Sequence, residues 1–182
     1  MYPTLCRLAG GESATAAKAP STAGGQVTAT IRRGQAADAR ALKDLDTIVP
    51  VDPRRAHSID RWLEQEVVFV AEVDGKVVGY GVVNHAFFHQ GNVDMLMLHP
   101  DHRGQQIGRQ LLEALEETCD TAKLFVTTNL SNHRMQRLLA RQGFAACGFI
   151  DELDPGDPEL VFVKKLGRTP RGPPGAAAAG AS

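Results

Sequence analysis

The segment from Leu96 to Leu112 joins an apolar stretch to an amphipathic helix through a turn that contains glycine and arginine. Glycines let a backbone approach a ligand closely, and the free N–H groups and the dipole of a helix's first turn attract anions. Arg103 adds a full positive charge between this strand and Gly104 and Gly108. These residues favour a phosphate-binding helix start, although an ordinary turn with a solvated arginine has the same composition.

The helix after this turn is predicted from its hydrophobic periodicity. Its polar residues fall mainly on the other faces, so one side can pack on a sheet and hold the turn in place. The apolar face is formed by Ile107, Leu111, Leu112, Leu115 and Cys119. The turn has neither the Gly-Lys-Ser/Thr of a nucleoside triphosphate site nor the G-x-G-x-x-G of a dinucleotide site. Its ligand would therefore carry phosphates of another kind.

Composition indicates one globular domain without a strongly charged partner. The chain has 182 residues, 43% of them hydrophobic, and its 20 basic and 21 acidic residues give a net charge of −1. We therefore expect binding to neither nucleic acid nor membranes. No apolar run approaches the ~18 residues of a membrane span, and the start of the chain lacks the apolar centre of a secretory signal. Cys6, Cys119 and Cys147 have no paired spacing, so a reducing, cytoplasmic location is predicted.

The folded unit is predicted at residues 27–166. Residues 1–26 are rich in Ala, Gly, Ser and Thr, and residues 167–182 are almost entirely Gly, Pro and Ala. Both segments are predicted to be disordered tails. Arg168, in the second of them, is expected to be solvated.

Within this unit, the pattern of apolar residues predicts strands and helices in the order β-α-α-β-β-β-α-β-α-β-β. The predicted strands are Val27–Arg32, Val67–Val73, Val77–Val83, Val93–Leu98, Leu124–Thr127, Phe144–Ile150 and Leu160–Lys165. Other helices are predicted from Ala37 or Asp38 through Val49, from Ser58, and from Asn132 to Gly143, with turns at Asp74–Lys76 and Gln90–Asn92. This order indicates an α/β fold whose mixed, mostly antiparallel sheet of about six or seven strands is flanked by about four helices on both faces.

Three separated features of the sequence together resemble the GNAT superfamily of acyltransferases. They are Ile31-Arg32-Arg33 followed by Asp38, the turn from Leu98 to Gly108, and Asn132 followed by a short helix ending at Gly143 and Phe144. The resemblance covers residues 27–166 in the right order. The central turn looks like that family's R-x-x-G-x-G/A signature, with Arg103 first and Gly108 last. The resemblance implies a single GNAT-like domain that uses acetyl-CoA as co-substrate.

The resemblance also implies which residues bind this co-substrate. In such enzymes the backbone amides of the turn and the helix start bind the CoA pyrophosphate. In this chain the segment comprises Arg103, Gly104, Gln105, Gln106, Ile107, Gly108 and Arg109. Backbone groups near Leu96 and Leu98 would pair with the pantetheine arm, as a peptide adds a strand to a sheet edge. Asn132 would hydrogen-bond the arm, cap its own helix, or do both.

Two positions depart from the family pattern. The fourth residue of the signature, usually Gly, is Gln106, which we expect to point outward from a helical backbone conformation. Where many members carry a Tyr that protonates the departing CoA thiolate, this chain has Leu139, and leucine cannot donate a proton. Either another donor or water serves, or the domain binds acyl-CoA without catalysis. Because a thiol with a pKa near ~8.5 needs little acid assistance at neutral pH, catalysis can survive this loss.

Transfer of an acyl group to an amine needs a base for the amine and a donor for the carbonyl oxygen. Strand alternation puts Asp94 on one side with Leu96 and Leu98, which makes Asp94 the candidate base. A backbone N–H near Leu98 is the candidate donor. The alternative for Asp94 is a strand-end carboxylate in water. The other candidate bases are His85, His89 and Glu72.

The histidines do not predict a metal site. His85 and His89 would lie ~13 Å apart along an extended strand, too far for one ion. His99 and His102 have no carboxylate or thiolate partner nearby in the sequence. We therefore expect no metal cofactor.

The loop from 151 to 159 carries five carboxylates between the last two predicted strands. It would attract a cationic amine if it borders the acceptor site, and it would otherwise be a solvated acidic loop. Trp62 could form the opposite wall of that site or belong to the core.

Together these residues predict an acetyl-CoA-dependent N-acyltransferase that acts by direct attack of a primary amine in a ternary complex. No cysteine is placed to suggest a covalent acyl-enzyme. The acceptor could be a small-molecule amine, a peptide N-terminus or a protein lysine. The alternative function is a non-catalytic, regulatory acyl-CoA-binding domain. A homodimer through an edge strand is compatible with this fold.

Overall fold

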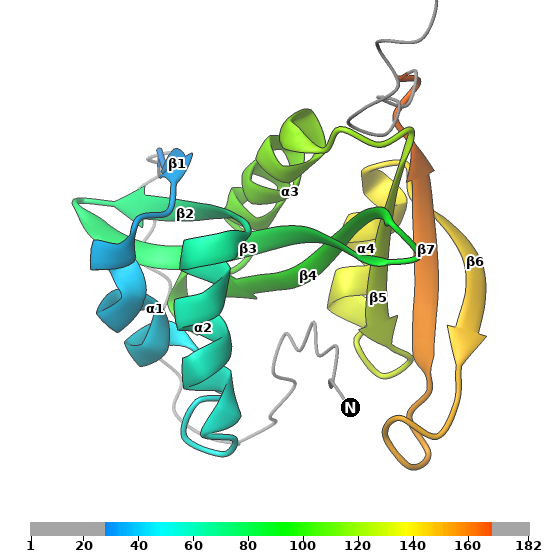
Figure 1. Cartoon of the computed structure of the whole chain (residues 1–182), viewed down its shortest axis with the longest axis horizontal. Helices are drawn as coiled ribbons and strands as arrows, with labels where there is room; N and C mark the ends of the chain where they lie inside the picture. Colours follow the sequence, from blue (N-terminus) through cyan, green and yellow to red (C-terminus); the bar gives the residue numbers. More distant parts are fainter. Residues whose placement is uncertain (1–27, 169–182) are drawn as a thin grey trace, which may run out of the picture.

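The computed structural model describes residues 28–168, which form seven strands, four α-helices and two short 3₁₀ helices (Figure 1). The strands are β1 Thr30–Arg33, β2 Val67–Val73, β3 Lys76–Phe87, β4 Gln90–Leu98, β5 Lys123–Asn129, β6 Ala145–Ile150 and β7 Glu159–Lys165. The helices are η1 Ala36–Asp38, α1 Ala39–Leu45, α2 Arg54–Gln65, η2 Pro100–His102, α3 Ile107–Thr118 and α4 His133–Arg141. The predicted first tail, Cys6 and most of the predicted second tail lie outside the described residues.

The strands form one sheet in the order β1-β2-β3-β4-β5-β7-β6. All neighbours are antiparallel except β4 and β5, which are parallel. This pair is short, because Gly91, Asn92 and Val93 match Leu124, Phe125 and Val126 and the register then stops. The later half of β4 therefore pairs with β3 alone. The predicted α/β class with a mixed, mostly antiparallel sheet is confirmed.

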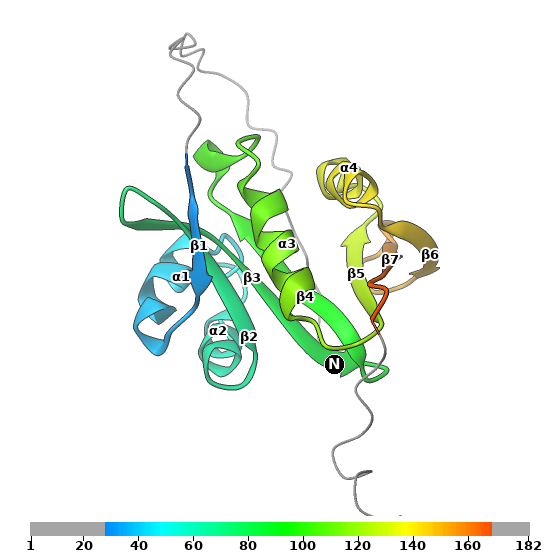
Figure 2. The same cartoon turned by 90° about the horizontal axis from the view of Figure 1, so that it is seen from above.

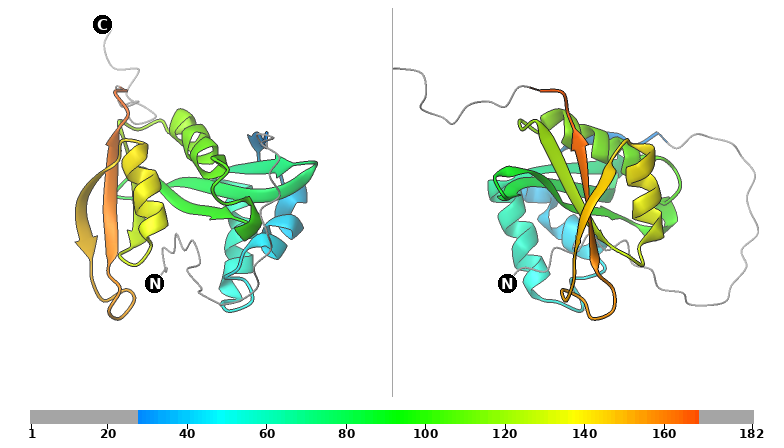
Figure 3. Two further views of the ribbon diagram at one scale, coloured as in Figure 1. Left: turned by 180° about the vertical axis from the view of Figure 1, so that it is seen from behind. Right: turned by 90° about the vertical axis from the view of Figure 1, so that its right-hand side faces the viewer.

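Helices cover both faces of the sheet. Figure 2 shows α1 and α2 on one side of β2 to β4 and α3 on the other. The α3 face packs with Val93, Leu96 and Leu98 of β4, and the α1 and α2 face packs with Met95 and Met97. In Figure 3, α4 lies with β5, β7 and β6 at the end of the molecule opposite α1 and α2. Strand β4 therefore contributes side chains to two hydrophobic cores, one on each face of the sheet.

The turn between β2 and β3 is the predicted one. Asp74 and Gly75 have φ values of 50° and 72°, the left-handed conformations that a tight hairpin requires. The predicted turn at Gln90–Asn92 is wrong, because the chain reverses at Phe88 and His89, with φ values of 52° and 57°.

Gly91 has a packing role instead of a turn role. A Cβ atom at this position would lie 2.3 Å from the Sγ of Cys119 and 2.9 Å from the Oγ1 of Thr121. The backbone N–H of Gly91 also donates to Thr121 Oγ1 at 2.9 Å. The glycine therefore lets the start of β4 lie against the connection between α3 and β5.

Helix α2 begins one turn earlier than predicted. Its first residue is Arg54, after Asp52 and Pro53, and the Asp52 Oδ1 accepts from the Arg54 N–H at 3.1 Å. Ser58 lies inside the helix, where its hydroxyl donates to the Arg54 carbonyl at 3.2 Å. Helix α1 in turn stops at Leu45, so the predicted extension through Val49 forms turns instead. The Asp-Pro pair was the true start signal, since proline is tolerated at a helix start.

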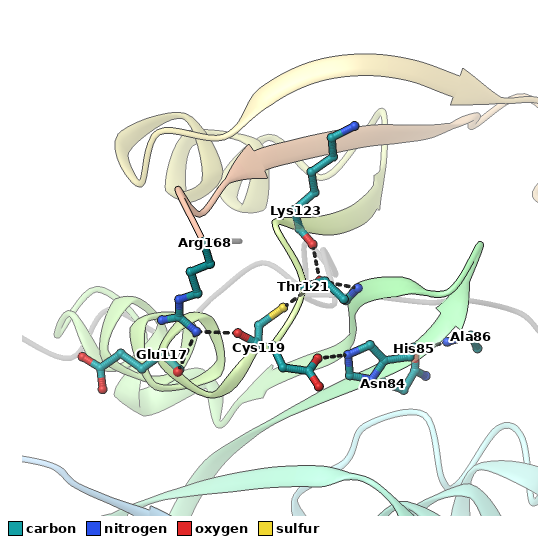
Figure 4. A network of polar contacts seen from close by, with 10 residues as sticks. Asn84, His85, Ala86, Glu117, Cys119, Thr121, Lys123 and Arg168 are labelled. Carbon is teal, nitrogen blue, oxygen red and sulfur yellow. Dashed lines mark hydrogen bonds and ion pairs between the residues drawn. The ribbon is translucent and has the colours of Figure 1, made fainter. Parts of the chain in front are cut away.

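Arg168 is exposed but contacts the fold (Figure 4). Its Nη1 donates to the carbonyl oxygens of Glu117, at 3.0 Å, and of Cys119. These carbonyls lie at the C-terminal end of α3, where a cation is favourable to the helix dipole. The expectation that Arg168 is solvated was therefore incomplete.

Candidate functional site

The connection from β4 to α3 leads from the end of β4 that β5 leaves unpaired into the first turn of the helix. Gly104 and Gln106 adopt left-handed conformations, with φ values of 81° and 64°. A Cβ on Gly104 would meet nothing within 4 Å, so this glycine serves the backbone conformation. Gln106 is the N-cap of α3 and makes no side-chain capping bond. The predicted helical conformation of Gln106 is wrong, because the chain reverses at this residue to enter the helix.

Gly108 brings the first turn of α3 close to the end of β4. A Cβ on Gly108 would lie 3.1 Å from Leu98 Cδ1 and 3.6 Å from Leu138 Cδ2. The first N–H groups of a helix have no acceptor within it. In α3 these groups begin at Ile107, after Gln105 and Gln106, and Gly108 packs on Leu98 in the part of β4 that β5 leaves unpaired. The segment thus combines the features of an anion site.

Two arginines place positive charge near this segment. The pKa of Arg103 is lowered by burial and, secondly, by the positive charge of Arg134. Arg134 is exposed on the first turn of α4. Two neighbouring guanidinium groups repel one another, and an anion bound between them would relieve this repulsion. Arg134 was not predicted as a site residue, although its position just after Asn132 at a predicted helix start could have indicated it.

Asn132 is the N-cap of α4. Its Oδ1 accepts from the Met135 N–H at 3.2 Å, which is the capping geometry expected of asparagine. Of the two roles predicted for Asn132, the cap is therefore present. Binding of the CoA arm by Asn132 remains a prediction.

Asp94 lies at a β-bulge in the middle of β4. Val82 of β3 matches Met95, while Val83 matches Val93, so Asp94 is the extra residue. A bulge shifts the alternation of side chains by one position. The prediction that Asp94 shares a face with Leu96 and Leu98 is therefore wrong.

The Asp94 carboxylate lies on the α2 side of the sheet. Its Oδ2 accepts from Nε1 of Trp62 at 2.9 Å. Burial raises the pKa of Asp94, while Trp62, Arg55, Arg61 and Asn84 act in the opposite direction. The result is a partly buried carboxylate whose pKa is raised, and a raised pKa makes a carboxylate a stronger base.

A second carboxylate belongs to this region. Glu66 is the C-cap of α2, and its backbone N–H donates to the Trp62 carbonyl at 2.9 Å. Burial raises the pKa of Glu66, and the charge of Asp94 raises it further. The α2 side of β4 thus holds two carboxylates with raised pKa values, which can take a proton from a ligand.

The alternative bases have other contacts. Glu72 accepts from Arg32 at 2.7 Å, and the same guanidinium makes two bonds of 2.8 Å to Asp38, so Glu72 belongs to a clamp between β1, η1 and β2. His85 is exposed and pairs through Nε2 with Asp120 at 2.7 Å (Figure 4). His89 lies at the tip of the β3–β4 turn.

Leu139 is fully buried in the core between α3 and α4. Its side chain contributes packing and offers no proton donor. The residue at the usual tyrosine position therefore serves the core of this protein.

The acidic loop is fastened to the β5–α4 connection. Asp154 accepts from the side-chain amide of Asn129 at 2.9 Å. Asp157 accepts from the backbone N–H of Ser131 at 2.8 Å and from its hydroxyl at 2.6 Å. These two carboxylates hold the loop in place, so the loop is less available to a cationic acceptor than its sequence suggested. Trp62, the other wall considered, is 4% exposed and belongs to the core.

The described part of the chain holds neither a metal-binding cluster nor a membrane-spanning helix. Within residues 28–168, no group of three or more His, Cys, Asp or Glu residues is arranged to hold a metal ion. None of the described helices is long and apolar enough to cross a membrane.

Comparison with known proteins agrees with this geometry. Residues 38–144 match the acetyltransferase (GNAT) family. An IAA acetyltransferase of Azospirillum brasilense is 31% identical over 133 residues, which cover 71% of this chain and 78% of the relative.

Solved structures share the fold. A GNAT-family acetyltransferase from Bacillus cereus has a TM-score of 0.71 at 24% identity, over 76% of this chain and 97% of that one. YncA of Salmonella typhimurium, solved with its cofactor acetyl-CoA, has a TM-score of 0.63 at 20% identity, over 76% and 94% of the two chains. With its Arg-Gly turn at the start of α3 and its sheet opened between β4 and β5, the chain belongs to the GNAT acetyltransferase family.

Proposed function

We propose that this protein transfers the acetyl group of acetyl-CoA to a primary amine by direct attack in a ternary complex. One observation carries the proposal. The length of β4 that β5 leaves unpaired leads through Arg103 and Gly104 into the start of α3, where the charge of Arg134 also acts. This arrangement offers a strand edge to an extended arm and an anion site to the phosphates at the end of that arm.

The residues of this segment suit CoA in charge and shape. The backbone amides from Arg103 to Arg109 would bind the pyrophosphate, and the guanidinium groups of Arg103 and Arg134 would neutralise it. Backbone groups near Leu96 and Leu98 would pair with the pantetheine arm, and Asn132 would contact the same arm. When bound, acetyl-CoA supplies an acyl group activated as a thioester.

Asp94 is the proposed base. Asp94 and Leu98 lie ~13 Å apart along β4, so a carboxylate oxygen of Asp94 takes the proton from the ammonium form of the acceptor through water, and the neutral amine can then attack the acyl carbon. The Leu98 backbone N–H donates to the carbonyl oxygen as negative charge develops on it. Leu139 cannot protonate the leaving thiolate, and a thiol with a pKa near ~8.5 leaves without full protonation.

The acceptor is proposed to be a primary amine on a small molecule or a peptide. The raised pKa values of Asp94 and Glu66 support this class, because an amine that brings a proton or a positive charge relieves the cost of their burial. The proposed acceptor side is the α2 side of β4, because the Asp94 carboxylate lies there.

The first test combines calorimetry with acetyl-CoA and thiol release in the presence of a panel of amines. Binding with amine-dependent thiol release supports the acetyltransferase. Arg103→Ala is expected to weaken binding by about 1–3 kcal/mol through lost charge-assisted hydrogen bonds. Arg40→Ala is the matched control, since Arg40 is exposed on α1. Unchanged affinity in Arg103→Ala would contradict the cofactor site.

The second candidate function is a non-catalytic acyl-CoA-binding domain, and buried Leu139 is the observation that favours it. Binding of acetyl-CoA without thiol release for any amine, in the native protein and in Asp94→Asn alike, would support this candidate. Amine-dependent release that Asp94→Asn abolishes would exclude it.

A further inference from the structure

We infer that Trp62 is a positioning residue for Asp94, whose carboxylate it orients through the indole N–H. The inference rests on the proposed function, in which Asp94 takes the proton of the acceptor amine. Trp62 itself touches neither the acyl group nor the amine in this scheme. It acts through the 2.9 Å hydrogen bond from Nε1 to Asp94 Oδ2.

The position of Asp94 explains why it needs an anchor. As the extra residue of a bulge, Asp94 has no partner directly opposite on β3. Neighbouring pairs in the ladder therefore do not fix its side chain. A donor from another element can fix the carboxylate, and Trp62 on α2 is such a donor.

Trp62 is itself held by a chain of buried polar groups. The Tyr80 hydroxyl donates to Asp46 Oδ2 at 2.5 Å, and Arg55 Nε lies 3.7 Å from the same oxygen. The Arg55 guanidinium lies 5.2 Å from the centre of the Trp62 ring. Asp46, Arg55, Trp62 and Tyr80 are each at most 7% exposed. The indole is thus fixed from β3 and from the α1–α2 connection, and its N–H is directed at Asp94.

Filling a core with these buried polar groups costs more free energy than filling it with apolar side chains. Burying the Asp46 and Arg55 charges carries a desolvation penalty that a set of apolar side chains would avoid. A phenylalanine at position 62 would fill a similar space without an N–H that needs an acceptor. An arrangement that orients Asp94 gives these polar groups a function.

The Asp94 carboxylate can still accept a proton when it is hydrogen-bonded to Trp62. A carboxylate offers about four acceptor sites, of which the indole N–H and the Asn84 side chain take one each. The remaining sites can receive the proton of the amine. The other charged or titratable groups that act on Asp94 or its neighbour Glu66 are Arg55 and Arg61 of α2 and His85 of β3.

The chain contains one tryptophan, which makes the test direct. The indole ¹H–¹⁵N resonance of the ¹⁵N-labelled full chain, without ligands, is followed as a function of pH. We expect one titration step that coincides with the pKa of Asp94, measured from the ¹³C signal of its carboxyl carbon. Asp94→Asn should abolish this step. An indole resonance that does not titrate, or that titrates equally in Asp94→Asn, would overturn the inference.

A kinetic test uses Trp62→Phe, with Ile59→Val as a matched control from the same buried face of α2. The indole bond lowers the pKa of Asp94, so its loss should move the acid limb of the kcat/KM profile to higher pH. Loss of a hydrogen bond to a charged group should lower kcat/KM about tenfold, with acetyl-CoA affinity unchanged. Ile59→Val should leave the profile in place. An unmoved profile in Trp62→Phe would contradict the inference.

The role of Asp94 as the base and the role of Trp62 in positioning it are tested by different measurements. If Asp94→Asn keeps full activity, Asp94 is not the base, and the proposed mechanism is wrong. The indole titration in the native protein still decides whether Trp62 orients this carboxylate. If the indole does not report the Asp94 titration, the positioning inference is wrong whatever the activity of Asp94→Asn.

Discussion

Asp94 combines a cost to stability with a proposed role in activity. Its pKa is raised by burial, so the native state holds the proton more tightly than the unfolded chain does. Stability therefore falls as pH rises from the ordinary pKa to the raised one, and the penalty is complete above it.

Asp94→Asn should consequently melt at a higher temperature than the native protein at pH ~7, by about 2–4 °C for each kcal/mol recovered. The difference should disappear below pH ~3, where Asp94 is protonated in both states. The same variant should lose about 10²-fold or more of the activity. Calorimetric Tm values at the two pH values check the first effect, and a lower Tm at neutral pH would show that Trp62 and the nearby arginines outweigh the burial cost.

The left-handed backbone conformation of Gln106 should lower the stability of the fold. A side chain in the left-handed region is strained by roughly 1–2 kcal/mol, and glycine avoids this strain but gains entropy in the unfolded chain. Gln106→Gly should therefore raise the free energy of unfolding by up to about 1 kcal/mol. Gln105, whose φ is not positive, is the control, and Gln105→Gly should destabilise the fold. Urea unfolding of both variants measures this, and equal destabilisation would contradict the strain.

At the scale of elements, the Arg32 clamp joins β1, η1 and β2. Hydrogen bonds from Arg32 lower the pKa of Asp38, whose side chain is 10% exposed. The stability from this ion pair is present above the ordinary pKa of Asp38 and is lost as pH falls through the lowered one. Asp38→Asn should cost about 1–3 kcal/mol at neutral pH, and the deficit should shrink below pH ~4. Chemical unfolding at both pH values tests this, and a deficit independent of pH would contradict the ion pair as its source.

The sequence predicted elements where local pattern and packing agree. The face of α3, the whole of β2 and the Asn132 cap follow from periodicity and capping chemistry. The turn between β3 and β4 was predicted at the wrong residues. Gly91 is required by its close contact with Cys119, which lies far along the chain, and not by a turn. The bulge at Asp94 was invisible for the same reason, since register is a property of two strands.

At the scale of the whole molecule, the candidate site is built from both parts of the opened sheet. Arg103 follows β4, while Arg134 and Asn132 follow β5, and the two strands pair over a short stretch only. The sequence indicated the segments separately, but only the fold brings Arg134 to Arg103. A ligand held from both sides should therefore strengthen the contact between the two parts.

Acetyl-CoA should accordingly stabilise the native protein. A ligand that binds only the folded state at 100 times its Kd contributes about 2.7 kcal/mol, which corresponds to a rise in Tm of about 5–10 °C for a chain of this size. Arg103→Ala and Arg134→Ala should each reduce this rise. If both arginines hold the same phosphates, the double variant should lose less than the sum of the two single losses, because removing one guanidinium already weakens the contact of the phosphates with the other. Scanning calorimetry of the four proteins at several concentrations of acetyl-CoA measures the coupling. Strict additivity would mean that the two arginines bind independent groups, and an unchanged Tm would contradict the cofactor site itself.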